Sequence, residues 1–305
     1  MCLHSAKFLH EKGYHVDFAV GSISKDLVKN KPYINDCIVV DEVKLLKKGK
    51  VEALQEIIKL NKNINYKNYD LVFLGHSDWR YKFLIFPIIF SSKIRSFHPV
   101  RGINHIEEYV RMVSSKDEAK KYFKSLITKD ESMNLQKVKR IVMAPGGAKN
   151  ILRNDAQRRW PIQHYVKLVK LINKKYPNVD VILIGAPSDS WVLEYFVDVK
   201  FVNQIGENTI PETQEVIKKS HYFISHDSGP LHFSLNTNTP TIALFGPTEA
   251  KEKYFKNNFK SRVLITDKKL DCMPCYDSKN YKKCFSYECM ETLSVDKVFS
   301  SIEFN

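Results

Sequence analysis

The feature that most constrains the fold is a repeated alternation between short strand-like runs and longer runs with helical periodicity. Strand-like runs lie at residues 16–20, 37–41, 70–75, 93–98, 140–145, 179–185, 222–226, 241–246 and 262–267. Helical patterns lie at residues 5–12, 51–62, 105–113, 162–176 and 211–220. Such alternation is typical of parallel sheets whose strands are joined by crossover helices. We therefore predict an α/β protein.

The length of 305 residues suits two domains of ordinary size. Residues 116–139 are polar and charged, which favours a linker there. We predict an N-terminal Rossmann-like domain over residues 1–125 and a C-terminal Rossmann-like domain over residues 126–292. Residues 293–305 are predicted to form a closing C-terminal helix. The two domains are expected to face each other across a cleft.

A formal charge of +14 indicates an anionic partner, although the lysines are scattered and would equally suit a solvated surface. The N-terminus lacks the pattern of a secretory signal. The longest apolar run, FLIFPIIF at residues 83–90, has eight residues and contains Pro87, whereas a membrane span needs about 20. It favours a buried helix or strand over a segment that touches a bilayer. We expect a cytoplasmic protein, with peripheral contact to a membrane surface left open.

Four of the six cysteines, Cys272, Cys275, Cys284 and Cys289, lie close together in the sequence. A CxxC pair followed by two more cysteines is compatible with a tetrahedral zinc site. Packed or free thiols explain the same residues, because the second pair has four intervening residues. Both interpretations stay open, and a disulfide framework is not expected.

Three turns of the second half follow predicted strands and carry small or hydroxyl residues. They read PGGAKN, which contains Gly146, Gly147 and Ala148, then GAPSD, and then HDSGPLH. Ligands of open parallel sheets bind beyond the carboxyl ends of the strands, and helix N-termini favour phosphate. Neither a P-loop nor a GxGxxG fingerprint is present in these turns. A nucleotide diphosphate held by separate turns is compatible with the pattern.

The third turn joins Asp227, Ser228 and Gly229 to a helix that carries His232. Either Asp227 or Ser228 would suit a helix N-cap, and His232 would suit a core position beside its apolar neighbours. A ligand site explains the same residues. The segment alone does not decide between these interpretations.

Residues 145–248 resemble glycosyltransferase family 9, the heptosyltransferases that build the inner core of lipopolysaccharide. The matching pieces are PGGAKN, RRWPIQHYVKLVKLI, VILIGAPSD, the Asp-Ser-Gly-x-x-His turn and PTIALFGPT, in that order. The later segment CMPCY…KC…CM also resembles many members. The resemblance implies a GT-B fold, with the sugar-nucleotide donor held mainly by the second domain.

The resemblance also implies roles for individual residues. Asp227, Ser228 and Gly229 would contact the sugar and diphosphate of the donor, with His232 supporting the same pocket. Arg158, where the family usually has lysine, would neutralise the diphosphate. The remaining donor-binding candidates are the glycine turn, Asp189 for a ribose hydroxyl, and Asn208 or Thr209 near the base.

The chain departs from the family at its start. Members begin with a strand and a loop that carries an aspartate, the family's presumed base, whereas this sequence begins within the first helix. The catalytic base would therefore lie upstream of Met1, and a sheet gap is expected in the first domain. Asp17 and Asp26 are poor substitutes, because neither lies in a loop between a strand and the first helix.

The implied function is an inverting transfer of a heptose or related sugar from a nucleotide-diphosphate donor, ADP-heptose above all, to a lipopolysaccharide core acceptor. An anionic acceptor at the inner-membrane surface fits the positive charge. No cofactor or metal is required, because Asp-x-Asp is absent and Arg158 supplies a cation. The alternative is a catalytically impaired member that only binds the sugar nucleotide. Nucleic-acid binding rests on charge alone and is not expected.

Overall fold

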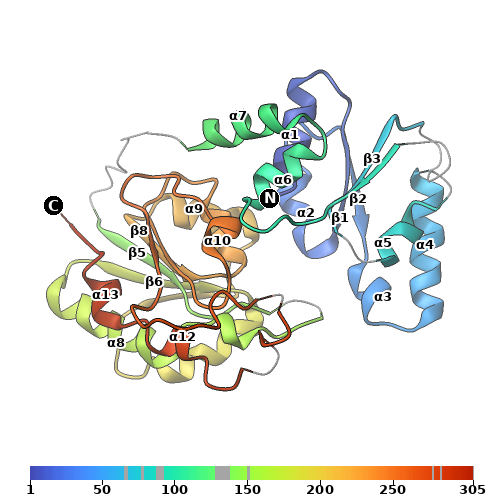
Figure 1. Ribbon diagram of the computed structural model, residues 1–305. Coiled ribbons are helices and arrows are strands. Elements are labelled where there is room, and N and C mark those ends of the chain that lie inside the picture. Colours follow the sequence, from blue (N-terminus) through green and yellow to red (C-terminus); the bar gives the residue numbers. More distant parts are fainter. Residues whose placement is uncertain are drawn as a thin grey trace. The chain divides into compact units, whose positions relative to one another are not determined.

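The computed structural model describes residues 1–64, 68–76, 79–86, 93–127, 138–149, 152–276, 278–281 and 284–304. The chain divides into two compact units, Met1–Ser125 and Leu126–Asn305 (Figure 1). Both are built from parallel strands and helices, as the alternation predicts.

The second unit is built on a six-stranded parallel sheet with the order β10-β9-β8-β5-β6-β7. Its strands are β5 (Arg140–Ala144), β6 (Asp180–Gly185), β7 (Val202–Ile205), β8 (Tyr222–His226), β9 (Thr241–Leu244) and β10 (Arg262–Leu264). Its helices are α8 (Ile162–Lys175), α9 (Ile210–Lys218), α10 (Gly229–Ser234), α11 (Ala250–Lys253), α12 (Glu288–Glu291) and α13 (Val295–Phe299). Two 3₁₀ segments, η3 (Ala156–Arg158) and η4 (Pro187–Tyr195), complete the unit.

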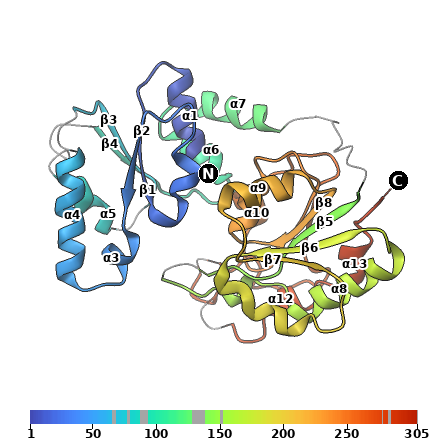
Figure 2. The same ribbon diagram turned by 180° about the vertical axis from the view of Figure 1, so that it is seen from behind.

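The sheet is covered on both faces, so its inner strands β5, β6, β8 and β9 read as largely apolar runs. Alternate residues of β5 point to opposite faces: Ile141 and Met143 join the core beneath α8 and α13, whereas Val142 and Ala144 join the core beneath α9. Figure 2 shows these helical layers on either side of the sheet. The helical stripe predicted for residues 162–176 is buried on its sheet-facing side at Tyr165, Leu168, Val169 and Ile172.

The strand order places a topological switch between β5 and β8. From β5 the chain moves to β6 and β7 on one side, and then returns to β8 on the other side. The chain segments that leave these two neighbouring strands diverge, which opens a position for a ligand at the carboxyl edge of the sheet. The PGGAKN turn follows β5 and the HDSGPLH turn follows β8, so both predicted turns lie at this switch.

The first unit contains two separate two-stranded parallel sheets among its described residues. One pairs β1 (Asp17–Gly21) with β2 (Asp36–Val40), and the other pairs β3 (Leu71–Leu74) with β4 (Lys93–Ser96). The helices are α1 (Leu3–Glu11), α2 (Lys25–Val28), α3 (Glu42–Leu46), α4 (Lys50–Ile64), α5 (Trp79–Leu84), α6 (His105–Arg111) and α7 (Lys116–Leu126), with a 3₁₀ segment η1 (Ser22–Ser24).

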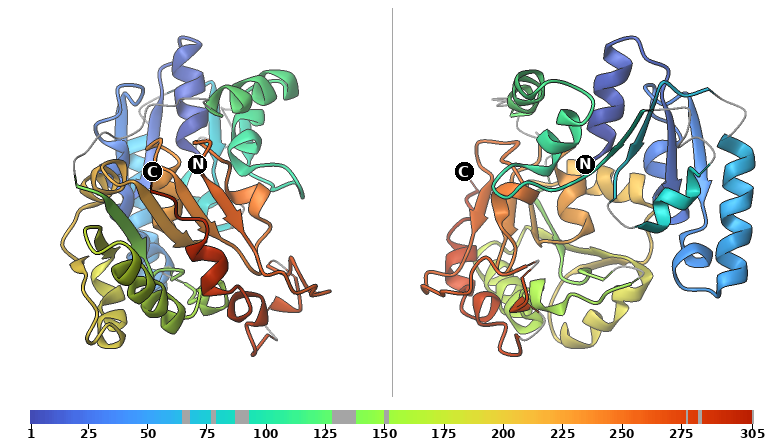
Figure 3. Two further views of the ribbon diagram at one scale, coloured as in Figure 1. Left: turned by 90° about the vertical axis from the view of Figure 1, so that its left-hand side faces the viewer. Right: turned by 45° about the vertical axis from the view of Figure 1, so that its right-hand side comes forward.

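The first unit also has separate small cores. Phe8 of α1, Val110 of α6 and Ala119 of α7 form one cluster. Val40, Leu45, Leu60, Ile64 and Leu84 form another, which joins β2 to α3, α4 and α5. The two views in Figure 3 show α1, α6 and α7 grouped on one side of this unit's strands.

Some expectations about segments are wrong. The predicted linker at 116–139 begins instead with the helix α7, because α1 and α6 supply the apolar partners that its sequence lacks. Residues 128–137 lie outside the described residues. The closing helix ends at Phe299 rather than at the chain end.

Of the apolar run at 83–90, Leu84 and Ile85 are buried, whereas Phe83 and Phe86 are exposed. Residues 87–90 lie outside the described residues. Within the described part, no helix combines the length and the hydropathy that crossing a bilayer requires.

Candidate functional site

The two turns predicted to bind a ligand are in contact at the switch point. The β5–β8 register pairs Ala144 with Ser225, and its continuation brings Gly147 opposite Ser228. A Cβ atom at Gly147 would lie 3.1 Å from the Ser228 Cβ, and Gly147 has a φ of 79°. Both observations require glycine at this position. Gly146 is buried in the same turn, and Ala148 also has a positive φ of 51°.

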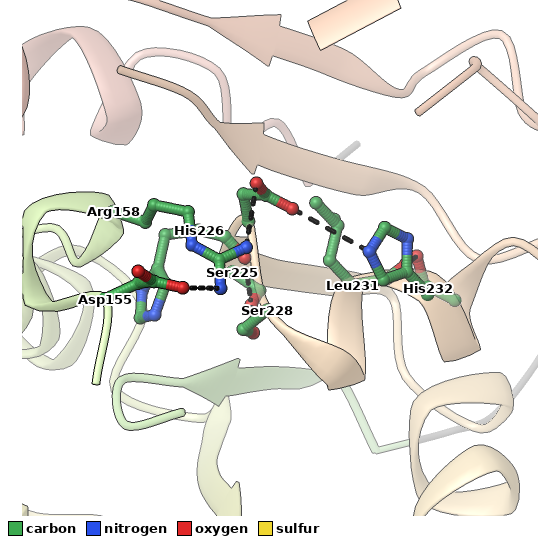
Figure 4. A network of polar contacts seen from close by, with 9 residues as sticks. Asp155, Arg158, Ser225, His226, Ser228, Leu231 and His232 are labelled. Carbon is green, nitrogen blue, oxygen red and sulfur yellow. Dashed lines mark hydrogen bonds and ion pairs between the residues drawn. The ribbon is translucent and has the colours of Figure 1, made fainter. Parts of the chain in front are cut away.

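Arg158 connects η3 to the turn after β8. Its Nη1 lies 3.2 Å from Asp227 Oδ2, and its Nη2 lies 3.2 Å from Asp155 Oδ2 (Figure 4). The guanidinium also stacks on Tyr276, with 5.3 Å from Cζ to the ring centroid. Burial acts to lower the pKa of Arg158, but Asp227, Tyr276 and Asp155 together outweigh it and raise that pKa. Arg158 therefore remains charged. Its two terminal nitrogens are paired with carboxylates, and its Nε has no hydrogen-bond partner among the described residues.

Asp227 also faces His232, which comes from the helix that follows. The distance from His232 Nε2 to Asp227 Oδ1 is 3.7 Å, and the His232 side chain is 29% exposed. Burial alone would raise the pKa of Asp227, but Arg158 and His232 reverse the shift and lower it. Burial lowers the pKa of His232 to about 4, with the nearby carboxylate opposing that shift. Asp227 is accordingly a carboxylate and His232 a neutral imidazole near neutral pH.

Several polar atoms at this site are buried without a hydrogen-bond partner among the described residues. They are Asp227 Oδ1, His232 Nδ1 and Arg158 Nε. Most buried polar atoms in native proteins are paired, so a cluster of exceptions indicates a place where a ligand supplies the missing partners. Gly229, the first residue of α10, is exposed beside them.

The base of the turn is held by buried hydrogen bonds. Ser225 Oγ lies 3.1 Å from Ser228 Oγ and donates to the His226 carbonyl at 2.9 Å. His226 Nδ1 lies 3.1 Å from the Tyr165 hydroxyl on α8. Ser228 is the N-cap of α10, but its side chain makes no capping hydrogen bond. Neither Asp227 nor Ser228 is thus explained by side-chain capping.

Asp189, for which the resemblance implies a ribose contact, holds two turns of the sheet edge together. Its side chain is buried, Oδ1 accepts from the Gly147 N–H at 2.9 Å, and Oδ2 accepts from the Ala186 N–H at 2.9 Å. Both carboxylate oxygens are occupied by backbone of the turns after β5 and β6. The carboxylate therefore acts as a clamp that holds these two turns together, and a ribose contact stays a prediction.

The other two weaker candidates lie farther along the sheet edge. Asn208 follows β7, which β5 and β6 separate from β8, and its Nδ2 donates to Gln204 Oε1 at 3.1 Å. Thr209 caps α9 in a reciprocal capping box with Glu212. The Thr209 hydroxyl therefore has a structural role, and a base contact for Asn208 stays a prediction.

Several residues of the site were missed by sequence reasoning. Arg159 donates through Nε to the Gly147 carbonyl at 2.8 Å, and its guanidinium lies 5.5 Å from the centre of the Trp191 ring. Asp155 and Tyr276 complete the surroundings of Arg158. The Arg-Arg doublet and the i, i+3 spacing of Asp155 and Arg158 were visible signals, whereas Tyr276 had none.

The four clustered cysteines line one small cavity of about 50 Å³ beside Pro247 and Tyr281. Burial raises the pKa of Cys275, and it raises the pKa of Cys289 to about 12, so these thiols are protonated near neutral pH. No three His, Cys, Asp or Glu side chains in the described part of the chain are arranged to hold a metal ion. The zinc interpretation thus gains no support from the described residues; Cys275 and Cys289 are buried, whereas Cys272 is exposed.

Solved structures resemble the whole described architecture. Escherichia coli ADP-heptose lps heptosyltransferase II has a TM-score of 0.69 at 14% identity, covering 98% of this chain and 92% of the other. A family 9 glycosyl transferase from Veillonella parvula has a TM-score of 0.68 at 18% identity, covering 98% and 91%. These likenesses confirm the predicted GT-B fold, the class of glycosyltransferases built from two Rossmann-like domains.

Comparison of the sequence with known proteins identifies the family within this class of glycosyltransferases. Residues 94–286 match the profile of "Glycosyltransferase family 9 (heptosyltransferase)". Lipooligosaccharide heptosyltransferase 2 of Campylobacter jejuni is 23% identical over 270 residues, which cover 84% of this chain and 80% of the relative. The chain belongs to glycosyltransferase family 9.

Proposed function

We propose that this glycosyltransferase moves a heptose from a nucleotide-diphosphate donor, with ADP-heptose the preferred one, to the core of lipopolysaccharide, with inversion at the anomeric carbon. Family membership supports the sugar. The name of the C. jejuni relative supports a lipooligosaccharide acceptor. The titles of similar solved structures, E. coli heptosyltransferase WaaC with ADP and with ADP-2-deoxy-2-fluoro heptose, support the adenine nucleotide.

One observation in this chain supports the proposed donor site. The glycine turn after β5 and the Asp-Ser-Gly turn after β8 are in contact at the switch point, and Arg158 reaches the second of them. Gly147 lets the two turns approach closely, Gly229 is exposed at the start of α10, and Arg158 and Arg159 supply positive charge for a diphosphate. The buried unpaired atoms of Asp227, His232 and Arg158 then gain partners from the donor.

The reaction requires an acceptor hydroxyl to attack the anomeric carbon from the side opposite the leaving group. The new carbon–oxygen bond forms as the bond to the nucleotide diphosphate breaks, and the leaving oxygen keeps the electron pair. A base removes the hydroxyl proton, and the arginines stabilise the charge that develops on the diphosphate. We assign the base to no residue of this chain. Asp17 Oδ2 already accepts from the Tyr69 hydroxyl at 2.9 Å, and Asp26 is exposed on the short helix α2.

Donor binding is tested by calorimetric titration of the 305-residue chain with ADP, ADP-heptose and UDP-glucose. We expect ADP-heptose to bind best, and we expect Arg158→Ala to weaken its binding at least tenfold, which corresponds to about 1.4 kcal/mol. Arg158→Lys keeps the charge and should lose less. Arg101→Ala, which removes an exposed arginine of the first unit, is the matched control and should bind as the wild type does.

Turnover is tested by ADP release in the presence of a heptose-deficient lipopolysaccharide core. Release that requires both donor and acceptor supports the proposal. Tight donor binding without any release would establish the alternative, a member that binds the sugar nucleotide but does not transfer it. Absence of binding by every nucleotide would refute the donor site itself.

A further inference from the structure

The helix α4 has apolar side chains on a face that points to solvent. Val51, Leu54 and Ile58 recur at i, i+3 and i+7 and are 67%, 56% and 47% exposed. Residues with this spacing lie along one side of a helix. Single exposed apolar side chains are ordinary, but an aligned row of three indicates an interaction surface.

The exposed row is separate from the row that attaches α4 to its unit. Leu60 and Ile64 are 1% and 8% exposed and pack with Val40, Leu45 and Leu84. Figure 2 shows α4 beside α5 at the edge of the first unit's strands. Folding of the helix therefore does not need Val51, Leu54 and Ile58, which must have another reason to be apolar.

Lysines surround the apolar row. Lys47, Lys48 and Lys50 are exposed at its N-terminal end, and Lys59 and Lys62 are exposed toward its C-terminal end. Ile58, Lys59 and Lys62 also line an open surface hollow of about 380 Å³, together with Gln55 and Asn63.

The stretch 43–63 contains just two carboxylates, and neither of them is exposed. Glu52 is half-buried. Glu56 is 2% exposed and accepts from the Asp41 N–H at 2.9 Å. The exposed surface of this stretch thus combines apolar, cationic and neutral polar side chains, with no anionic side chain fully in solvent.

We propose that this surface, formed by Val51, Leu54 and Ile58 with the five surrounding lysines, binds the face of a bilayer that contains anionic phospholipid. Apolar side chains that enter the boundary between headgroups and acyl chains, flanked by lysines that meet the phosphates, are the two elements of interfacial membrane binding. A soluble acidic protein would satisfy the lysines but would gain less from the aligned aliphatic row. A bilayer satisfies both.

The inference deepens the proposed function, because an acceptor anchored in a membrane must be met at the membrane surface. It does not depend on donor chemistry. Vesicles without any lipopolysaccharide are sufficient to test it, so the donor site and the membrane surface can fail independently.

The test is co-sedimentation of the full chain with vesicles of phosphatidylglycerol and phosphatidylethanolamine, against vesicles of phosphatidylcholine alone. We expect binding to the anionic vesicles that falls at least tenfold between about 50 mM and 500 mM NaCl, because salt screens the lysines. The triple variant Val51→Ser, Leu54→Ser and Ile58→Ser should lose at least tenfold in partitioning at low salt.

Charge is tested separately by Lys47→Gln, Lys48→Gln and Lys50→Gln, which should reduce binding to anionic vesicles by a similar factor. The matched control is Lys167→Gln, Lys170→Gln and Lys174→Gln on α8, which removes three exposed lysines from the second unit. A second control, Val197→Ser with Val202→Ser, removes two apolar side chains that are 65% and 43% exposed. Both controls should bind as the wild type does.

Three results would overturn the proposal: equal binding to phosphatidylcholine, wild-type binding by the triple serine variant, or no vesicle binding at all. Self-association that the triple serine variant abolishes, without vesicle binding, would assign the surface to a second copy of the chain instead. Circular dichroism and ADP affinity should be unchanged in the variants, because the substituted side chains are exposed.

Discussion

Removing the carboxylate of Asp189 should destabilise the second unit, and the size of the effect can be worked out from its contacts. The carboxylate accepts two backbone N–H groups, from Gly147 and Ala186, each at 2.9 Å. A hydrogen bond to a charged group contributes about 1.5–3 kcal/mol, and truncation leaves both N–H groups unpaired. We therefore expect Asp189→Ala to lower the free energy of unfolding by about 3–5 kcal/mol. Asp189→Asn keeps one acceptor and should cost about 2 kcal/mol.

The assay is urea unfolding followed by tryptophan fluorescence in a Trp79→Phe background. The remaining tryptophans, Trp160 and Trp191, both lie in the second unit, so the signal reports that unit alone. With a slope of about 2 kcal/mol per molar urea, a loss of about 3 kcal/mol moves the midpoint by about 1.5 M. Asp271→Ala, at an exposed aspartate, is the control and should leave the midpoint in place.

The two roles considered for Asp189, a clamp between two turns and a contact to a ribose hydroxyl, predict opposite results for Asp189→Ala. If Asp189 mainly contacts a ribose hydroxyl, Asp189→Ala weakens ADP binding while the urea midpoint stays within about 0.3 M of the wild type. That outcome would refute the clamp. A stability that falls from the wild type to Asp189→Asn, and falls further in Asp189→Ala, would support the clamp.

Two further perturbations address the buried surroundings of the site. Burial lowers the pKa of His226 to about 3, so its imidazole is neutral in the folded chain and takes up a proton near pH 6.5 only on unfolding. The neutral imidazole thus contributes to stability fully above pH 6.5, and this contribution is lost as the pH falls. Urea titrations should show the free energy of unfolding fall by about 2 kcal/mol between pH 7 and pH 5 because of His226. The variant His226→Gln should lack this loss. Gly246→Ala should cost about 1–3 kcal/mol by the same measurement, because its Cβ would lie 2.4 Å from Met290 Sδ in a fully buried position. Met290→Ala should relieve part of that cost, because the added Cβ would still lie 2.9 Å from Cys289 Sγ, and fully additive losses in the double variant would argue against the clash with Met290.

The contact between the two turns could be predicted because it depends on sheet geometry alone. Both turns follow apolar runs, and in a parallel sheet all such ends lie at one edge. The strand β7 escaped prediction because it reads VNQI, a short edge strand whose exposed polar residues give no apolar run. The helix α7 escaped prediction because its few apolar residues are completed by α1 and α6.

The contact partners of the charged residues could not be predicted from the sequence in the same way. Tyr276 stacks on Arg158 from a segment 118 positions later, and nothing in its neighbourhood indicates that contact. Asp189 was predicted as a ribose contact because the resemblance implies that role. Its true role depends on Gly147, which only the pairing of β5 with β6 brings within reach. Local patterns therefore located the site, but the assignment of each charge needed the tertiary contacts.

The charge balance at the site explains why arginine, rather than lysine, suits position 158 in this chain. The guanidinium divides its two terminal nitrogens between Asp155 and Asp227, and its Nε is buried without a partner among the described residues. A lysine ammonium is a single point charge and could not span both carboxylates while keeping a third donor directed elsewhere. The two carboxylates fix the plane of the guanidinium before any ligand arrives, which removes the entropy cost of ordering it. An anion that accepts a hydrogen bond from Nε therefore binds to a guanidinium that is already ordered. Sharing this guanidinium with the anion weakens its ion pair with Asp227 and leaves the fold unchanged.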